Sequence, residues 1–171
     1  MDLSGLEILC GGPIKSLFSK TREFDPGMRE LVLRAVEALR DRGAVVNSAH
    51  IAEGFGVPDL TSQAITVRDL SWCDSCDVYV ALWPTGPDGL PYLSSGTAIE
   101  LGWVASLGKP IVLAWDEQRA SSYSHLQRGL DAVTAVEFAD LRRVAQDAGV
   151  LADAVARVKA KGVPRAHSGA R

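Results

Sequence analysis

The chain has 171 residues, of which 47% are hydrophobic and 23% are charged, a balance typical of one globular domain with a buried core. Its net charge of −3 gives no electrostatic reason to expect a nucleic-acid partner, and no apolar run is long enough to cross a membrane. The first residues lack the basic segment and apolar core of a signal peptide, so we expect a cytoplasmic protein.

The cysteines are odd in number and consist of Cys10, Cys73 and Cys76. Cys73 and Cys76 have the CxxC spacing, but no second pair accompanies them, and two thiols cannot complete a zinc site. A redox role would need a thioredoxin-like context, which the surrounding pattern does not offer. We therefore expect buried or half-buried free thiols, and neither a metal nor a cofactor.

The first predicted strand, residues 6–10, runs directly into a turn made of Gly11, Gly12, Pro13, Ile14 and Lys15. Two glycines after the first strand of an alternating fold mark a place where the backbone can approach a ligand. The spacing is not GxGxxG, so the turn gives little support for a dinucleotide site. Lys15 either supplies a positive charge for a phosphate or is a surface lysine on a tight turn.

Residues 16–26 are polar with scattered aromatic side chains, which suggests a loop over the site. An amphipathic helix follows over residues 26–42, and a second strand over residues 44–46 leads toward a loop over residues 51–60. Open α/β sheets bind ligands at the carboxyl ends of their strands, and His50 comes a few residues after this one. His50 is therefore a candidate substrate-binding residue, although a loop histidine can also be merely solvated.

Another helix is predicted over residues 61–75, and it carries Asp69 in its second half. The next strand, residues 78–82, ends in a long Pro/Gly-rich loop over residues 83–92. Loops of this kind beside a helix N-terminus are often functional. Taken alone, Asp69 is either a site carboxylate or one of many solvated helix carboxylates.

The most informative stretch, residues 94–110, opens with small or hydroxyl-bearing residues and then turns helical: Ser94, Ser95, Gly96 and Thr97. A helix N-terminus with free N–H groups and flanking hydroxyls is a ready anion site. Glu100 lies about one turn inside it. It either faces the neutral or cationic part of a phosphate-bearing ligand or simply complements the helix dipole. A buried face for this helix is expected from Ile99, Leu101, Val104 and Leu107.

The remainder of the chain continues the alternation of strands and helices. We expect strands over residues 111–115 and 135–138, a short helix over 125–131 and a last amphipathic helix over 139–161. These elements predict one α/β domain over residues 1–162, followed by a flexible tail over 163–171. About five strands in a mostly parallel, doubly wound sheet, with helices on both faces, fit this order.

Three separated pieces of the chain resemble the nucleoside 2-deoxyribosyltransferase superfamily. They are Cys10-Gly11-Gly12-Pro13, Asp69 placed eight residues before Asp77, and Ser95 to Trp103 followed by Gly108-Lys109-Pro110. Within the superfamily the chain is most similar to the nucleoside 5′-monophosphate N-glycosidases. Asn47 to His50, with Glu53 and Gly56, also resemble the pyrimidine-nucleotide hydrolase branch. The similarity covers roughly residues 6–135.

This resemblance implies a flavodoxin-like fold and specific roles for several residues. A glutamate at the position of Glu100 acts on the anomeric carbon of the sugar, and an aspartate at the position of Asp69 orients it or assists the base. The 5′-phosphate would bind residues 94–97 and the Gly11-Gly12 turn. Lys15 stands where the glycosidases often have an arginine, which keeps the charge but loses the bidentate fork.

The resemblance also implies a homodimer or a dimer of dimers, in which a serine from the partner chain completes the phosphate site. Ser124 is the candidate, although its position also suits the cap of the short helix that begins at His125. The 83–92 loop is long and distinctive, so the identity of the base does not carry over from the family.

The function predicted from these residues is hydrolysis of the N-glycosidic bond in a nucleoside 5′-monophosphate. A pyrimidine nucleotide such as CMP or hydroxymethyl-CMP is favoured, with free base and (deoxy)ribose 5-phosphate as products. Two alternatives stay open. A deoxyribosyltransferase would pass the sugar to a second base, and a non-catalytic module would only bind the nucleotide. A cytokinin-type phosphoribohydrolase shares the Gly-Thr-x-x-Glu pattern, but the second glycine-rich phosphate motif is missing.

Overall fold

The strands of the sheet follow the alternation that the sequence predicts. The computed structural model describes residues 2–20, 23–57 and 59–161, and within these residues five parallel strands form one sheet. The strands are β1 (Glu7–Gly11), β2 (Val45–Asn47), β3 (Val78–Trp83), β4 (Ile111–Trp115) and β5 (Val136–Asp140). Their spatial order is β2-β1-β3-β4-β5, and every pair is parallel. The predicted doubly wound α/β fold is confirmed.

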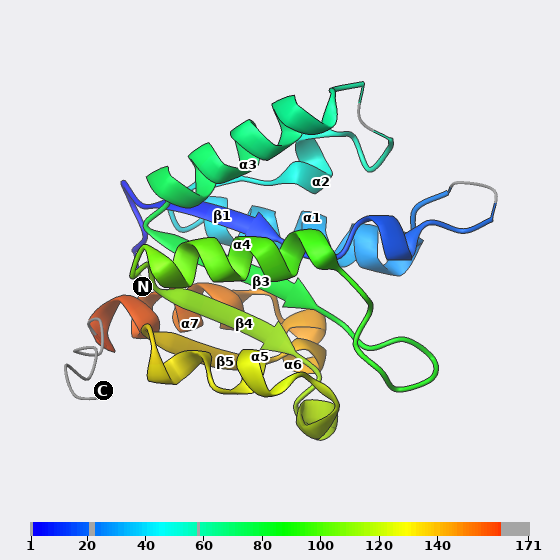
Figure 1. Cartoon of the computed structure of the whole chain (residues 1–171). Helices are drawn as coiled ribbons and strands as arrows, with labels where there is room; N and C mark the ends of the chain where they lie inside the picture. The colour runs from blue at the N-terminus through cyan, green and yellow to red at the C-terminus, as the bar shows by residue number, and fades with distance from the viewer. Residues whose placement is uncertain (1, 21–22, 58, 162–171) are drawn as a thin grey trace, which may run out of the picture.

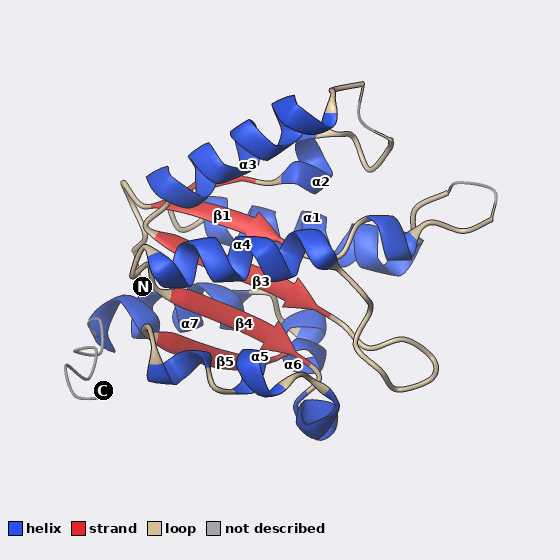
Figure 2. Ribbon diagram, viewed as in Figure 1, coloured by secondary structure: helices blue, strands red, loops and turns tan. Residues whose placement is uncertain are grey.

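Helices cover both faces of this sheet (Figure 1, Figure 2). One face is covered by α1 (Pro26–Arg40), α6 (Leu141–Gln146) and α7 (Gly149–Lys161). The other is covered by α3 (Ser62–Ser75) and α4 (Ser95–Ser106), which contact each other and the central strands. A core therefore lies on each side of the sheet.

Strand β3 shows how the two cores are divided, because successive side chains of a strand point to opposite faces. Toward α1 and α7 it presents Val78, Val80 and Leu82. Toward α3 and α4 it presents Tyr79, Ala81 and Trp83. Tyr79 is the one of these six with an ionisable side chain, and it is fully buried.

The helix ends carry the capping residues that the sequence offers. Asp25 accepts a hydrogen bond from the Met28 N–H at the start of α1, where Pro26 occupies the first turn. Gly43, with a φ of 90°, follows the end of α1 in the left-handed conformation that glycine adopts easily. Thr61 caps α3 through the Ala64 N–H. These caps account for helix boundaries close to the predicted ones.

Three predicted segments differ from the structure. The short helix expected over residues 125–131 ends at Arg128 and is followed by a separate 3₁₀ turn over Leu130–Ala132. A short helix, α2 (Ala49–Ala52), occupies part of the expected 51–60 loop. The single helix predicted over residues 139–161 is in fact two, α6 and α7. The break falls at Asp147, whose backbone is extended and whose side chain accepts the Gly149 N–H at 2.9 Å. The carboxylate offers the chain a local alternative to the helical hydrogen bond.

Short helical segments complete the connections that follow β1 and β4. They are the 3₁₀ turns Lys15–Leu17, Glu117–Ser122 and Leu130–Ala132, and the α-helix α5 (His125–Arg128). Across residues 2–20, 23–57 and 59–161, no helix is both long and apolar enough to cross a membrane. The tail predicted over residues 163–171 lies outside the described residues.

Helix α4 is apolar over more of its surface than a single buried face requires. Leu101 and Val104 are buried, as predicted. Ile99 and Leu107, which were also expected to be buried, are instead 50% and 45% exposed. Only two of the four apolar side chains predicted to face the core therefore do so. The three cysteines are buried and form no disulfide, as predicted.

Candidate active site

The strand order reverses between β1 and β3, because the chain passes from β1 to β2 on one side and returns to β3 on the other. Ligands of open α/β sheets bind beyond the carboxyl ends of the strands at such a point. A cavity of about 860 Å³ lies there. Its walls come from segments far apart in the sequence: Gly12, Ile14, Lys15, Ser16, Phe18, Ala49, Glu53, Gly56, Val57, Ile65, Asp69, Leu93, Ser94, Ser95, Gly96, Thr97 and Glu100.

Glu100 reaches this cavity from the second turn of α4 and is held from below by Tyr79 of β3. The Tyr79 hydroxyl donates a hydrogen bond to Glu100 Oε2 at 2.5 Å. A Cβ at Gly11 would come within 2.5 Å of that hydroxyl and 3.0 Å of the same carboxylate oxygen. Gly11 therefore leaves space for the Tyr79–Glu100 pair.

The environment of Glu100 favours its neutral form more than water does. Burial is the largest influence and raises the pKa of Glu100 to about 7, with the Tyr79 hydrogen bond acting against it and the charge of Asp69 adding to it. Burial, together with the neighbouring Glu100, also raises the pKa of Tyr79 well above its usual value, so Tyr79 stays a hydrogen-bond donor. A carboxylate with a pKa near neutrality is typical of catalytic positions.

The N-terminus of α4 forms a second part of the cavity wall. Ser94 caps the helix by accepting the Thr97 N–H at 3.3 Å, and its hydroxyl lies 2.7 Å from the Thr97 hydroxyl. Ser95 and Gly96 are exposed, and no described atom lies within 4 Å of a Cβ built at Gly96. Space is therefore open beside the first turn of this twelve-residue helix, and the first N–H groups of a helix have no partner within it, which suits an anion. Lys15 lines the same cavity from the turn after β1.

A third wall of the cavity carries two more carboxylates. Asp69 projects from α3, and Glu53 follows α2. The guanidinium of Arg68 contacts both: Nε donates to Asp69 Oδ1 at 2.8 Å, and one terminal nitrogen donates to Glu53 Oε1 at 2.7 Å. Asp69 is therefore ion-paired and partly buried, and is not simply a solvated helix carboxylate.

His50 supports the glycine turn from behind. Its side chain is buried, and Nε2 donates a hydrogen bond to the Pro13 carbonyl oxygen at 3.0 Å. Burial lowers the pKa of His50, so the ring is neutral at physiological pH. The ring also packs against Phe24 and Phe55. His50 is not solvated, and it is not among the described residues that line the cavity.

Ser124 lies on α5 in a local capping arrangement. Its hydroxyl accepts the Gln127 N–H at 3.2 Å, and the Gln127 side chain accepts the Ser124 N–H at 2.9 Å. This reciprocal pair is the capping box that stabilises a helix N-terminus. Within its own chain, Ser124 is not among the residues described as lining the cavity.

A family model described as nucleoside 2-deoxyribosyltransferase matches residues 20–159 of the chain. The chain belongs to this family. The resemblance seen in the three sequence motifs is therefore confirmed. None of the curated proteins matches the sequence.

Solved structures with the same fold include BlsM, a CMP N-glycosidase and a 2-deoxyribosyltransferase. BlsM, known from a solution structure, is 29% identical, with 97% of this chain and 99% of its own chain covered and a TM-score of 0.69. The CMP N-glycosidase BcmB of Clostridium botulinum is 21% identical, with coverages of 84% and 98% and a TM-score of 0.58. A 2-deoxyribosyltransferase of Bacillus psychrosaccharolyticus is 23% identical, with coverages of 85% and 95% and a TM-score of 0.51.

Most of the residues predicted to form the site of this deoxyribosyltransferase-family chain meet in one cavity. Those that line it are Gly12, Ile14, Lys15, Asp69, Ser94, Ser95, Gly96, Thr97 and Glu100. Gly11, Pro13 and His50 stand directly behind the wall. Ser124 remains apart, so a role for it at the site requires a second chain.

Sequence reasoning missed three residues that the structure places at the site: Tyr79, Glu53 and Arg68. Tyr79 had a signal, because it is the one hydroxyl-bearing side chain in the apolar run 78–82. Glu53 was named only as part of the resemblance to the pyrimidine-nucleotide hydrolase branch, and no role at the site was assigned to it. No sequence signal pointed to Arg68, because a charged helix residue beside an aspartate is usually solvated.

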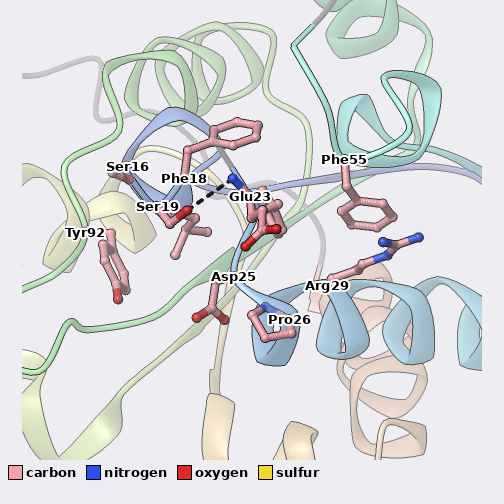
Figure 3. A pocket seen from close by; sticks show the side chains of 11 residues that line it. Ser16, Phe18, Ser19, Glu23, Asp25, Pro26, Arg29, Phe55 and Tyr92 are labelled. Carbon is pink, nitrogen blue, oxygen red and sulfur yellow. Dashed lines mark hydrogen bonds between the residues drawn. The ribbon is translucent and has the colours of Figure 1, made fainter. Parts of the chain in front are cut away.

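A second cavity, of about 700 Å³, adjoins the first, because Ser16 and Phe18 line both. Tyr92 stands on one side of it and Phe55 with Arg29 on the other (Figure 3). The Arg29 guanidinium lies 5.1 Å from the centre of the Phe55 ring. Ser16 and Phe18, at the start of the predicted loop over the site, thus contribute to both cavities of this family member. Among residues 2–20, 23–57 and 59–161, no cluster of three or more His, Cys, Asp or Glu side chains is arranged to hold a metal ion.

Proposed function

We propose that the chain hydrolyses the N-glycosidic bond of a nucleoside 5′-monophosphate and releases free base and (deoxy)ribose 5-phosphate. The observation that carries this proposal is the position of Glu100, whose partly buried carboxylate shares one cavity with the N-terminus of its own helix, where an anion can bind. A phosphate bound at residues 94–97 would place the sugar of the same nucleotide toward Glu100. The fold neighbour that cleaves CMP makes a pyrimidine nucleotide, CMP or hydroxymethyl-CMP, the first substrate to test.

The chemistry assigned to the site proceeds in two steps. First, a Glu100 carboxylate oxygen bonds to C1′ as the C1′–N bond breaks, and the electron pair passes to the base, which takes up a proton. Water then adds to C1′, the bond to Glu100 breaks, and the water loses a proton as the carboxylate is restored. Both steps pass through an oxocarbenium-like sugar, which the carboxylate stabilises. Asp69 orients the sugar or assists the base.

The proposal is tested by incubating the protein with matched nucleosides and nucleoside monophosphates and measuring free base and sugar phosphate. We expect free base and a sugar 5-phosphate in equal amounts from at least one monophosphate. A second base is then added to the reaction. Formation of a new nucleoside in place of free sugar would instead support a deoxyribosyltransferase, and tight nucleotide binding without any product would support a binding module.

We further propose that the protein forms a homodimer or a dimer of dimers with a shared active site. Both helices over the cavity side of the sheet expose apolar side chains: Val67 at 68%, Leu70 at 43% and Ile99 at 50% exposure. A second copy of the chain would remove this apolar surface from water. Ser124 of the partner is the candidate for completing the phosphate site.

If Ser124 acts across the interface, Ser124→Ala and Glu100→Gln proteins should complement each other. Each is expected to be impaired alone, and mixing with subunit exchange should restore activity, because one site of the mixed dimer carries both substitutions and the other carries none. Activity is measured before and after exchange. A failure to recover activity in exchanged dimers, or a fully active monomer at nanomolar concentration, would show that Ser124 serves only as the α5 cap.

A further inference from the structure

Arg68 is the charged side chain that joins the two carboxylates on the third wall of the cavity. It extends from α3 and donates one hydrogen bond to Asp69 of the same helix and one to Glu53 of the segment after α2. All three side chains are largely buried, with exposures of 18% for Arg68, 15% for Asp69 and 6% for Glu53. The Arg68 guanidinium is also held by a cation–π contact, since it lies 4.7 Å from the centre of the Trp72 ring. The group is therefore fixed on several sides.

The backbone beside Glu53 is fixed as well. Gly54 and Phe55 both have a φ of 58°, in the left-handed region, which a residue such as phenylalanine adopts at a cost of about 1 kcal/mol. The Phe55 side chain is buried against Phe24 and His50, which holds this conformation. The turn directs Glu53 to the cavity and Phe55 away from it.

Two carboxylates side by side, facing a third, would repel each other strongly without a cation. Glu53 and Asp69 line the cavity together with Glu100, whereas Arg68 is not among the described lining residues. Arg68 thus contacts the carboxylates from behind and is placed to act through them. A planar guanidinium suits this task because its nitrogens can bind two carboxylates in fixed directions.

We propose that Arg68 is a positioning residue, whose fork fixes Glu53 and Asp69 at one wall of the cavity and balances their charge opposite Glu100. This inference rests on the proposed role of Glu100. It assigns to Glu53 a part in the site as well, as a carboxylate whose charge acts on Glu100. It also predicts that removing Arg68 and removing the charge of Glu53 shift the pKa of Glu100 in opposite directions.

The groups that face Glu100 come from every element around it. They are Tyr79 of β3, Arg68, Asp69 and Cys73 of α3, Glu53 after α2, and Lys15 after β1. Burial raises the pKa of Cys73 to about 12, so this thiol is uncharged near neutrality. Arg68 favours ionised Glu100, while Glu53 and Asp69 disfavour it. Arg68, Asp69 and Glu53 therefore all contribute to the electrostatic environment of Glu100.

The test measures the Glu100 pKa directly, by carbon NMR of protein labelled at the glutamate carboxyls, with Glu100→Gln identifying the signal. Arg68→Gln should raise this pKa by about half a unit to one unit, and Glu53→Gln should lower it by a similar amount. In the double variant the two changes should largely cancel. Arg157→Gln, which breaks a distant arginine–glutamate pair with a 2.8 Å contact, serves as the matched control and should leave the pKa unchanged.

The acid limb of the kcat/KM profile should move with the pKa in each variant, since the ionised form of Glu100 is the active one. Arg68→Lys should leave the limb near its original pH but lower kcat/KM about tenfold, because lysine keeps the charge and loses the fork. Comparing Arg68→Lys with Arg68→Gln therefore separates the positioning role of Arg68 from the effect of its charge. Arg68→Lys also keeps the proposal testable if Arg68→Gln does not fold.

The outcomes distinguish this inference from the proposed function. Shifts of the same sign for Arg68→Gln and Glu53→Gln, or no shift in either, would overturn the positioning role even if the protein hydrolyses nucleotides. Opposite shifts that cancel in the double variant would support it, even if the substrate panel yields no free base and the proposed function fails.

Discussion

Replacing Glu100 with glutamine should lower kcat for base release by at least about a thousandfold while the protein remains folded. Glutamine has nearly the same shape and can still accept the Tyr79 hydrogen bond, but it cannot form the bond to C1′ or balance the charge of an oxocarbenium ion. Turnover is measured as free base under saturating substrate. Glu30→Gln, at an exposed position on α1, is the matched control and should retain wild-type activity. Retention of more than about a tenth of the activity by Glu100→Gln would remove Glu100 from the catalytic role.

The same substitution should stabilise the fold, which separates loss of catalysis from loss of structure. Burial raises the pKa of Glu100 from 4.5 to about 7 on folding. Between these values the folded chain keeps a proton that the unfolded chain has lost, so stability falls as the pH rises. At about pH 8 the ionised carboxylate costs roughly 1–3 kcal/mol. Glu100→Gln should therefore melt a few degrees higher than the wild type there, with a much smaller difference near pH 5.

Removal of the 5′-phosphate from the substrate should lower kcat/KM by about a hundredfold to a thousandfold. The phosphate would accept hydrogen bonds from the free N–H groups of α4 and the adjacent hydroxyls, and it would pair with Lys15. Each charge-assisted hydrogen bond contributes about 1.5–3 kcal/mol. The measurement compares CMP with cytidine, or any matched pair. Equal kcat/KM values would contradict a nucleotide site and favour the transferase.

Lys15 offers a way to locate that phosphate on the protein. Lys15→Gln should reduce kcat/KM about tenfold to a hundredfold for the monophosphate and hardly at all for the nucleoside. The contribution of Lys15 to phosphate binding is then given by the difference between the kcat/KM losses on the two substrates, and not by the loss on one substrate alone. Lys159→Gln, which removes an ammonium paired with Asp77 elsewhere on the molecule, should affect neither substrate. An equal loss on both substrates for Lys15→Gln would show that Lys15 supports the turn and does not contact the phosphate.

The sequence predicted the order of the elements and the location of the site because these depend on local signals. Short apolar runs alternate with amphipathic segments, and the start of α4 combines a capping serine, a glycine and a threonine. The carboxyl ends of parallel strands then gather the turn after β1 and the start of α4 in space. Glu100 followed from this placement and from the family motif, whereas Asp69 followed from the family motif alone.

Contacts between distant segments were beyond the sequence. Tyr79 meets Glu100 because β3 presents that side chain to α4, and this depends on the register of β3 in the sheet. The Arg68–Glu53 contact depends on how the left-handed turn at Gly54 and Phe55 is folded. His50 was correctly placed near the strand end, but its inward orientation depends on packing against Phe24. The break at Asp147 reflects a side chain competing with the helix backbone.

Helix α7 has a consequence for the order in which the molecule is made. It contacts β3, β4, β5 and α1, and its buried residues are Leu151, Ala152, Ala154, Val155 and Val158. Every residue named as lining the 860 Å³ cavity is translated before it. During synthesis, the strands that support the cavity must therefore wait with one apolar face only partly covered, by α1 and α6, until residues 149–161 have left the ribosome. The nascent chain can carry all the side chains of the site and still lack the packed sheet that holds them in place.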